Sequence, residues 1–235
     1  MQTHNFKIVG GDTDSIMFCK QDMSPFSEDE QESLLKEINS LLPKEIKFAN
    51  DGVFKTVIYL KAKNYVMLDE KGKKKIKGSS LKSSTIEPIL KQMMSEIIDC
   101  ILNDNIQGVT LIYNKYLSMV DTITDITPWC SKKTLSSTTY NSERKNETDI
   151  IDAVAGSQYG SGDRVYLYTG RKTVETGEYY KVGEKKGLPK TKTVKYLKLK
   201  ENFQNDHSIE HYKERVKKVA QIFEPVLGKD FYKNS

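Results

Sequence analysis

The sequence predicts an α+β protein, with antiparallel strands in its first part and mainly helices after about residue 83. Two observations carry this prediction. Between residues 53 and 77, β-branched and aromatic residues occur in short runs separated by turn residues, which is typical of an antiparallel meander. Between residues 86 and 120, apolar residues recur every three or four positions, the period of amphipathic helices. The 235 residues are enough for one or two domains, and we expect a boundary between segments 1–82 and 83–235.

A β-hairpin is expected at the start of the chain. The apolar runs 6–9 and 16–18 flank the turn-forming sequence GGDTDS at residues 10–15. A helix follows, because Ser27 and Glu30 have the spacing of a capping box ahead of an apolar stripe. The stripe consists of Leu34, Leu35, Ile38, Leu41 and Leu42.

The meander is expected to have three strands. The first two, at residues 53–60 and 64–68, are rich in β-branched and aromatic residues. The turn at residues 69–72 leads to a third, lysine-rich strand at residues 73–77. We interpret lysines 73–75 as a solvated hairpin tip.

Helices dominate the expected second part. They are predicted at residues 86–102, 106–120, 147–154 and 207–226. Ser83, Ser84 and Thr85 are expected to cap the first of them. Short strands are predicted at residues 164–168 and 194–199, a turn at 159–163, and a polar loop at 131–146.

Positive charge is concentrated in two segments, although the formal net charge of the chain is only +5. Segment 61–82 carries an excess of six positive charges and segment 171–200 an excess of seven, so the rest of the chain is net acidic. Such segregation favours a binding face for a polyanion, most often nucleic acid. The alternative is that the lysines are merely solvated at hairpin tips.

Membrane and secreted classes are disfavoured. No apolar run approaches the ~20 residues of a membrane span, and residues 1–7 lack the apolar region of a secretory signal. The cysteines 19, 100 and 130 form no CxxC pair, which indicates buried or idle thiols in a reducing compartment. His207 and His211 lie four positions apart without a third ligand in the local pattern, so we expect surface residues rather than a metal site.

Asp12 and Asp14 lie at the tip of the predicted hairpin. In an extended segment, residues i and i+2 point to the same side, so both carboxylates could face one cation. Mg²⁺ is oxygen-seeking and usually takes one or two protein carboxylates together with substrate phosphates. The alternative is an ordinary turn, because Asp and Ser readily hydrogen-bond their own backbone.

The neighbouring sequence resembles a known enzyme family. Residues 9–18 read VGGDTDSIMF, which resembles the third palm motif of family B DNA polymerases, usually written YGDTDS. Residues 63–65 (KNY) resemble the K-x-Y element of that family, and residues 75–78 (KIKG) resemble the stretch that enters the thumb. Residues 82–85 (KSST) are similar to the sequence that follows in phage members.

The resemblance continues almost to the end of the chain. Residues 133–135 (KTL) and 162–166 (GDRVY) resemble two pieces of the polymerase thumb, and residues 209–227 are similar to its closing helix. The resemblance implies that residues 1–82 are the C-terminal part of a palm, with the motif C hairpin and antiparallel strands. It implies that residues 83–235 are a mainly helical thumb.

The family's chemistry implies site residues. Asp14 would be the direct metal ligand and Asp12 a supporting carboxylate. Two Mg²⁺ ions would take part, one activating the primer 3′-hydroxyl and the other steadying the pyrophosphate. Primer–template DNA and dNTP would be the substrates. The DNA contacts implied are Lys63 and Tyr65 near the primer end, and Lys77, Gly78, Lys82 and Ser83 along the backbone.

The departures from the family are also informative. Gly10 stands where the family usually has tyrosine, and residues 62–65 (AKNY) are a reduced form of Lys-Lys-Arg-Tyr. The first palm motif, the fingers helix and the exonuclease domain are absent from these residues. We therefore expect a second polypeptide to carry them, no polymerase activity in the isolated chain, and a cytoplasmic location (the host cytoplasm if the source is a virus).

Two alternatives remain open. The chain could be a non-catalytic DNA-binding protein that resembles a thumb, or an inactive polymerase fragment. The Asp12 and Asp14 pair argues against a pure binder, which has no need of two carboxylates beside phosphates. An independent metal-dependent nuclease is disfavoured, because two carboxylates without a further acid or base are too few.

Overall fold

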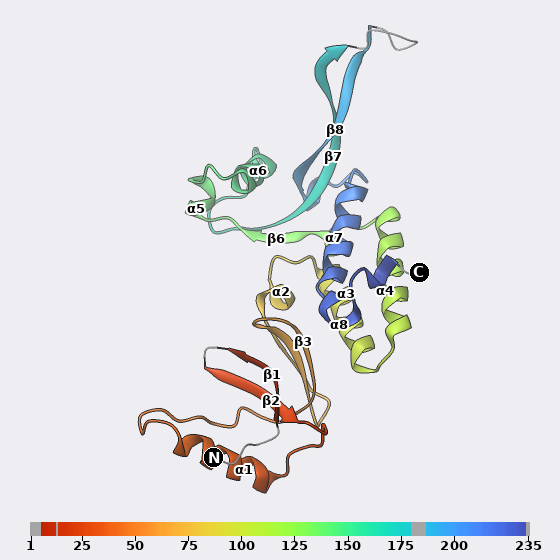
Figure 1. Ribbon diagram of the computed structural model, residues 1–235. Helices are drawn as coiled ribbons and strands as arrows, with labels where there is room; N and C mark the ends of the chain where they lie inside the picture. The colour runs from red at the N-terminus through yellow and green to blue at the C-terminus, as the bar shows by residue number, and fades with distance from the viewer. Residues whose placement is uncertain (1–5, 13, 180–186, 234–235) are drawn as a thin grey trace. The chain divides into compact units, whose positions relative to one another are not determined.

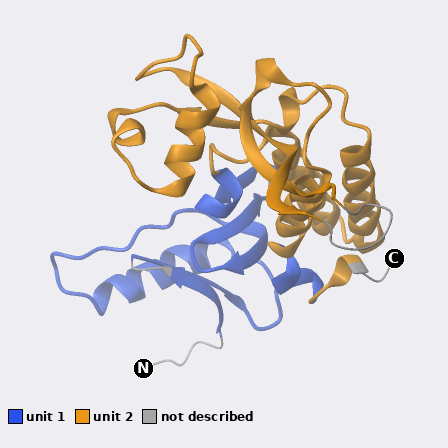
Figure 2. Ribbon diagram, turned by 90° about the horizontal axis from the view of Figure 1, so that it is seen from above, with its two compact units in different colours: residues 1–82, 223–228 blue, residues 83–222, 229–235 orange. Residues whose placement is uncertain are grey.

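The chain divides into two units, which Figure 2 colours separately. The first comprises Met1–Lys82 with Phe223–Gly228, and the second comprises Ser83–Ile222 with Lys229–Ser235. The structure is a computed structural model that describes residues 6–12, 14–179 and 187–233, with the backbone only for Asp12 and Lys233. Antiparallel sheets and helices are mixed, so the predicted α+β class is confirmed.

The expected hairpin opens the first unit. Strand β1 (Phe6–Asp12) pairs antiparallel with β2 (Ser15–Lys20), and the register shifts between Ile8 and Gly10. Helix α1 (Glu28–Ser40) begins after Ser27, where both hydrogen bonds of the capping box form. No described residue of α1 is buried, so its apolar stripe is less covered than its pattern suggests.

The expected meander is also present (Figure 1). It consists of β3 (Phe54–Lys61), β4 (Asn64–Asp69) and β5 (Lys74–Lys77), followed by the short helix α2 (Ser79–Lys82). Helix α8 (Glu224–Leu227) returns from the far end of the chain to contact β3. The buried apolar residues here are Ile58, Leu60, Val66, Met67 and Leu81.

Three helices form one core of the second unit: α3 (Pro88–Leu102), α4 (Ile106–Asp121) and α7 (Ile209–Gln221). The capping serines were predicted wrongly, because α3 begins after Glu87, with Pro88 in its first turn. Glu87 is held instead by a bidentate ion pair with Arg215 of α7, at 2.9 and 2.6 Å. The fully buried side chains include Leu90, Met93, Ile97, Val109, Tyr116, Val120 and Val216.

The last predicted helix and its histidines need correction. It is interrupted, since α7 ends at Gln221 and α8 is a separate turn. His207 precedes the helix and is buried, with its Nε2 atom 3.1 Å from the Val120 carbonyl oxygen. It also forms an isolated bridge with Gly170, so the passing strand covers a residue that was expected on the surface.

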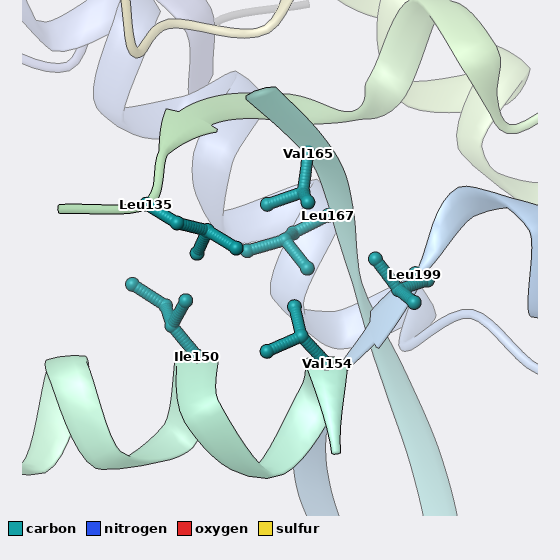
Figure 3. Close-up of a cluster of buried hydrophobic side chains, with 6 residues drawn as sticks. All are labelled: Leu135, Ile150, Val154, Val165, Leu167 and Leu199. Atoms are coloured by element: carbon teal, nitrogen blue, oxygen red, sulfur yellow. The ribbon is translucent and has the colours of Figure 1, made fainter. Parts of the chain in front are cut away.

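A three-stranded sheet forms the rest of the second unit. Strand β6 (Ser131–Thr134) and helix α5 (Ser137–Tyr140) replace the expected loop, and α6 (Lys145–Val154) follows. Strands β7 (Arg164–Tyr179) and β8 (Pro189–Leu199) are longer than predicted and pair as a two-stranded ribbon. Their inner ends pack with α6 around the cluster of Leu135, Ile150, Val154, Val165, Leu167 and Leu199 (Figure 3).

Short 3-10 turns complete the described elements, at Thr127–Trp129, Lys200–Asn202 and Phe231–Lys233. Cys130 follows the first of them and is buried. Burial raises the pKa of its thiol to about 12, which keeps it protonated at neutral pH. None of the helices in the described part of the chain has the length and apolar content to cross a bilayer.

Candidate metal and nucleic-acid site

The two aspartates lie at the tip of the β1–β2 hairpin. Asp12 is the last residue of β1 and pairs with Ser15 across the ladder, and Asp14 is exposed in the turn between the strands. The expectation that both carboxylates point to one side involves the Asp12 side chain, which lies outside the described atoms.

At this tip the Asp14 carboxylate is exposed, which is compatible with one ligand of a Mg²⁺ site. An exposed carboxylate on a tight turn is open to a hard cation, and Mg²⁺ commonly uses only one or two protein carboxylates. Among the described side chains, no group of three or more His, Cys, Asp or Glu residues could hold a metal ion. A metal site at this tip would therefore need further ligands besides the described side chains.

The base of the hairpin is anchored by side chains. Phe6, Phe18 and Phe26 form an aromatic cluster with ring centroids 5.3 to 5.8 Å apart. Lys20 of β2 donates to both carboxylate oxygens of Glu30 in α1, at 2.7 and 2.8 Å. These hydrogen bonds, together with the one from the Ser27 backbone N–H, hold the pKa of Glu30 below its ordinary value. The tip thus projects from a fixed base.

The K-x-Y element forms the turn from β3 to β4. Lys63 is exposed and has a left-handed backbone conformation, with φ of 63°. Tyr65 is half-buried at the start of β4 and lies directly across from Tyr59 of β3. Their rings stack, with centroids 6.1 Å apart and planes inclined by 8°. The turn therefore presents Lys63 to solvent beside a fixed pair of tyrosines.

Asn64 is a site residue that sequence reasoning missed. Its side chain is only 5% exposed. Its Nδ2 donates to the Ala62 carbonyl oxygen at 3.0 Å, and its Oδ1 accepts from the Ser80 backbone N–H at 2.9 Å. The second bond ties the β3–β4 turn to the start of α2. The signal available in the sequence was a polar residue within an apolar strand pattern, which says nothing of its partner.

Gly78 fits closely against this asparagine. Its φ is 109°, a conformation that residues with side chains rarely adopt. A Cβ atom at this position would collide with Oδ1 of Asn64 and the carbonyl oxygen of Lys63. Glycine is therefore required directly after β5, and it lets the backbone at this point lie close to the K-x-Y turn.

The remaining predicted DNA contacts lie nearby along the chain. Lys77 is exposed and pairs with Tyr65 across the β4–β5 ladder, so four of the six predicted contacts meet at one end of the meander. Lys82 is exposed at the end of α2. Ser83 belongs to the second unit, and its hydroxyl hydrogen-bonds that of Thr85 at 2.7 Å.

Exposed lysines lie at both ends of the meander. Lys61, Lys63 and Lys77 are at the end of the K-x-Y turn, and Lys71, Lys73 and Lys74 are at the opposite end, in or beside the β4–β5 turn. Most lysines of segment 61–82 are exposed, so they add positive charge to the surface of the first unit. Lys75 is an exception, because it is half-buried and pairs with Asp51 at 3.2 Å. The exposed lysines are Lys61, Lys63, Lys71, Lys73, Lys74, Lys77 and Lys82.

Comparison with curated proteins finds similarity to DNA polymerases. The chain is 25% identical to a DNA polymerase of Paramecium bursaria Chlorella virus NY2A over 94% of its own length and 25% of the relative. It is 30% identical to a DNA polymerase catalytic subunit of human herpesvirus 8, over 42% of the chain and 10% of that subunit. The chain thus spans a quarter or less of these curated relatives.

The fold comparison agrees. The structure of the family B DNA polymerase from the archaeon Pyrobaculum calidifontis matches 96% of this chain and 27% of its own, with a TM-score of 0.59 and 18% identity. The sequence model of DNA polymerase family B matches residues 1–226. The chain belongs to DNA polymerase family B.

Proposed function

We propose that this chain is the C-terminal palm and thumb portion of a DNA-directed DNA polymerase that acts in DNA replication. Residues 1–82 supply the end of the palm, and residues 83–235 supply the thumb. The observation that carries the proposal is the pair of aspartates at the tip of a hairpin whose unit also presents the K-x-Y turn. The aspartate pair and the K-x-Y turn lie at positions that match the family's motifs.

Asp14 and Asp12 would hold Mg²⁺ at the hairpin tip. The bound ions supply neutralisation of the charge that develops during nucleotidyl transfer. Asp14, exposed in the turn, serves as the direct ligand, and Asp12, paired in the ladder with Ser15, supports it. The aromatic cluster and the hydrogen bonds between Lys20 and Glu30 hold the base of the hairpin, which limits the reorganisation needed when substrates bind.

The DNA contacts hold the primer strand. Lys63 and Tyr65 contact the primer near its 3′ end, and Lys77 and Gly78 follow its backbone. Lys82 and Ser83 continue the contact where the thumb begins. Such contacts involve phosphate and sugar, carry no sequence information, and make binding depend strongly on salt.

The rest of the active site comes from elsewhere. A carboxylate of the first palm motif and the fingers residues that hold the incoming dNTP do not occur in these 235 residues. We propose that a segment outside these residues, on a second polypeptide or on a longer form of this one, supplies them together with any exonuclease, and that the 235 residues alone are inactive. Replication would take place in the cytoplasm, that of the host if the source is a phage or another virus.

Primer extension tests this proposal. The chain alone, and the chain mixed with a polypeptide that carries the first palm motif and fingers, are incubated with Mg²⁺, dNTPs and a primed template. We expect extension only in the mixture. If the mixture binds primed DNA but extends nothing, the non-catalytic DNA-binding function replaces the polymerase function.

A further inference from the structure

The Gly10 position has no room for a side chain. A Cβ atom there would lie 2.6 Å from Cε2 of Tyr59, 3.1 Å from its Cδ2 and 3.3 Å from Cε of Met17. Real Cβ atoms do not approach a ring as closely as 2.6 Å. The backbone itself would accept another residue, because Gly10 is not among the residues with positive φ. The ring of Tyr59 is therefore the obstacle.

Tyr59 belongs to a different sheet from Gly10. In the described part of the chain, β1 and β2 form a two-stranded sheet, and β3, β4 and β5 form a separate one. No backbone ladder joins these described strands across the two sheets, so a contact between the sheets has to involve side chains. The Tyr59 ring against Gly10 provides such a contact, two residues before Asp12.

The ring of Tyr59 is not free to swing away. It stacks on Tyr65 in a nearly parallel arrangement, and both rings are half-buried. The same pair of strands places Tyr59 and Tyr65 opposite each other in the ladder. A continuous line of contacts thus runs from the aspartate hairpin, through Gly10 and Tyr59, to the K-x-Y turn.

We propose that Tyr59 is a positioning residue, whose ring fills the space left by Gly10 and sets the aspartate hairpin against the strand of Tyr65. The side chain that this hairpin lacks is supplied from the neighbouring sheet. The effect of this contact on catalysis rests on the proposed function, but the contact between Tyr59 and Gly10 does not. The ring, rather than the phenolic hydroxyl, makes the contact.

A double-mutant cycle on the purified chain tests the contact without reference to activity. Gly10→Ala is expected to lower the unfolding midpoint in the parent, because the new methyl group meets the ring. In a Tyr59→Ala background the same change should leave the midpoint unchanged or raise it. Tyr140→Ala, an exposed tyrosine in the second unit, serves as the matched background in which the loss persists. Equal losses in all three backgrounds would overturn the contact.

The positioning role is tested in the reassembled polymerase by single-nucleotide incorporation. Tyr59→Ala should lower the incorporation rate at least tenfold while the affinity for primed DNA changes less than twofold. Tyr59→Phe should retain the parent rate, and Gly10→Tyr combined with Tyr59→Ala should recover most of it. An unchanged rate for Tyr59→Ala would overturn the positioning role and leave the polymerase function standing. Absence of incorporation by the parent would refute the proposed function alone.

Discussion

Replacing Asn64 with alanine should weaken the first unit measurably. The side chain makes two hydrogen bonds, to the Ala62 carbonyl oxygen and from the Ser80 N–H, and is 5% exposed. Each bond contributes about 1 kcal/mol, and a donor left without a partner adds about 1 kcal/mol or more. Because Ser80 is only half-buried, water can reach part of the gap. We expect a loss of about 2–3 kcal/mol, a large share of the ~5–15 kcal/mol typical of a domain.

Urea unfolding followed by far-ultraviolet circular dichroism measures this loss, and hydrogen exchange locates it. The midpoint should fall at constant slope, with faster exchange in β3 to β5. Asn141→Ala is the matched control, because Asn141 is exposed, and its change should stay within about 0.5 kcal/mol. If the unfolding midpoint of Asn64→Ala equals that of the control, the hydrogen bonds of Asn64 do not stabilise the K-x-Y turn and the reasoning is refuted.

Three further results are expected. Arg215→Ala leaves the buried Glu87 carboxylate without its ion-pair partner and should lower the free energy of unfolding by about 3 kcal/mol. An unchanged midpoint of thermal unfolding would show that the ion pair does not stabilise the fold. Burial lowers the pKa of His211, so the unfolded chain binds more protons than the folded chain. The free energy of unfolding should therefore fall as the pH drops below the unfolded pKa of about 6.5. In a pH series of melting curves, His211→Asn should remove this dependence. Lys77→Gln should weaken binding to duplex DNA and reduce the slope of log K against log salt concentration by about 0.9, as measured by fluorescence anisotropy. An effect no larger than that of Lys36→Gln would argue against a phosphate contact at Lys77.

The strands of the meander were predictable from sequence. They are rich in β-branched and aromatic residues, and turn residues stand where the chain reverses between β4 and β5. The start of α1 was predictable too, because a capping box is a local signal. The start of α3 was not, since Glu87 is held by Arg215, which lies 128 positions further along the chain.

The ribbon of β7 and β8 shows a second feature that could not be predicted from the sequence. Residues 171–179 are exposed except for the half-buried Val174, so no apolar alternation marks the outer strand. Its pairing depends on cross-strand neighbours, such as Lys172, which lies over the ring of Tyr196 at 4.9 Å. Strand β6, with the polar sequence SKKT, likewise forms only because β7 pairs with it.

The candidate site also has features that the sequence predicts and contacts that it does not. The motif strings at residues 9–18 and 63–65 predicted a hairpin and a strand turn, and both elements are present. The contacts of Asn64 with Ser80 and of Gly10 with Tyr59 join segments far apart in sequence. Neither contact follows from a local pattern, because each depends on how one strand packs against another segment.

The most direct test of the account is a comparison of Asp14→Asn with Asp152→Asn in the reassembled polymerase. Asp152 is exposed on α6 and serves as the matched control. Removing a carboxylate ligand should slow nucleotide incorporation at least ~100-fold. The account predicts this loss for Asp14→Asn alone, with the affinity for primed DNA unchanged in both variants. Incorporation by Asp14→Asn at the rate of the control would contradict a catalytic role for the hairpin.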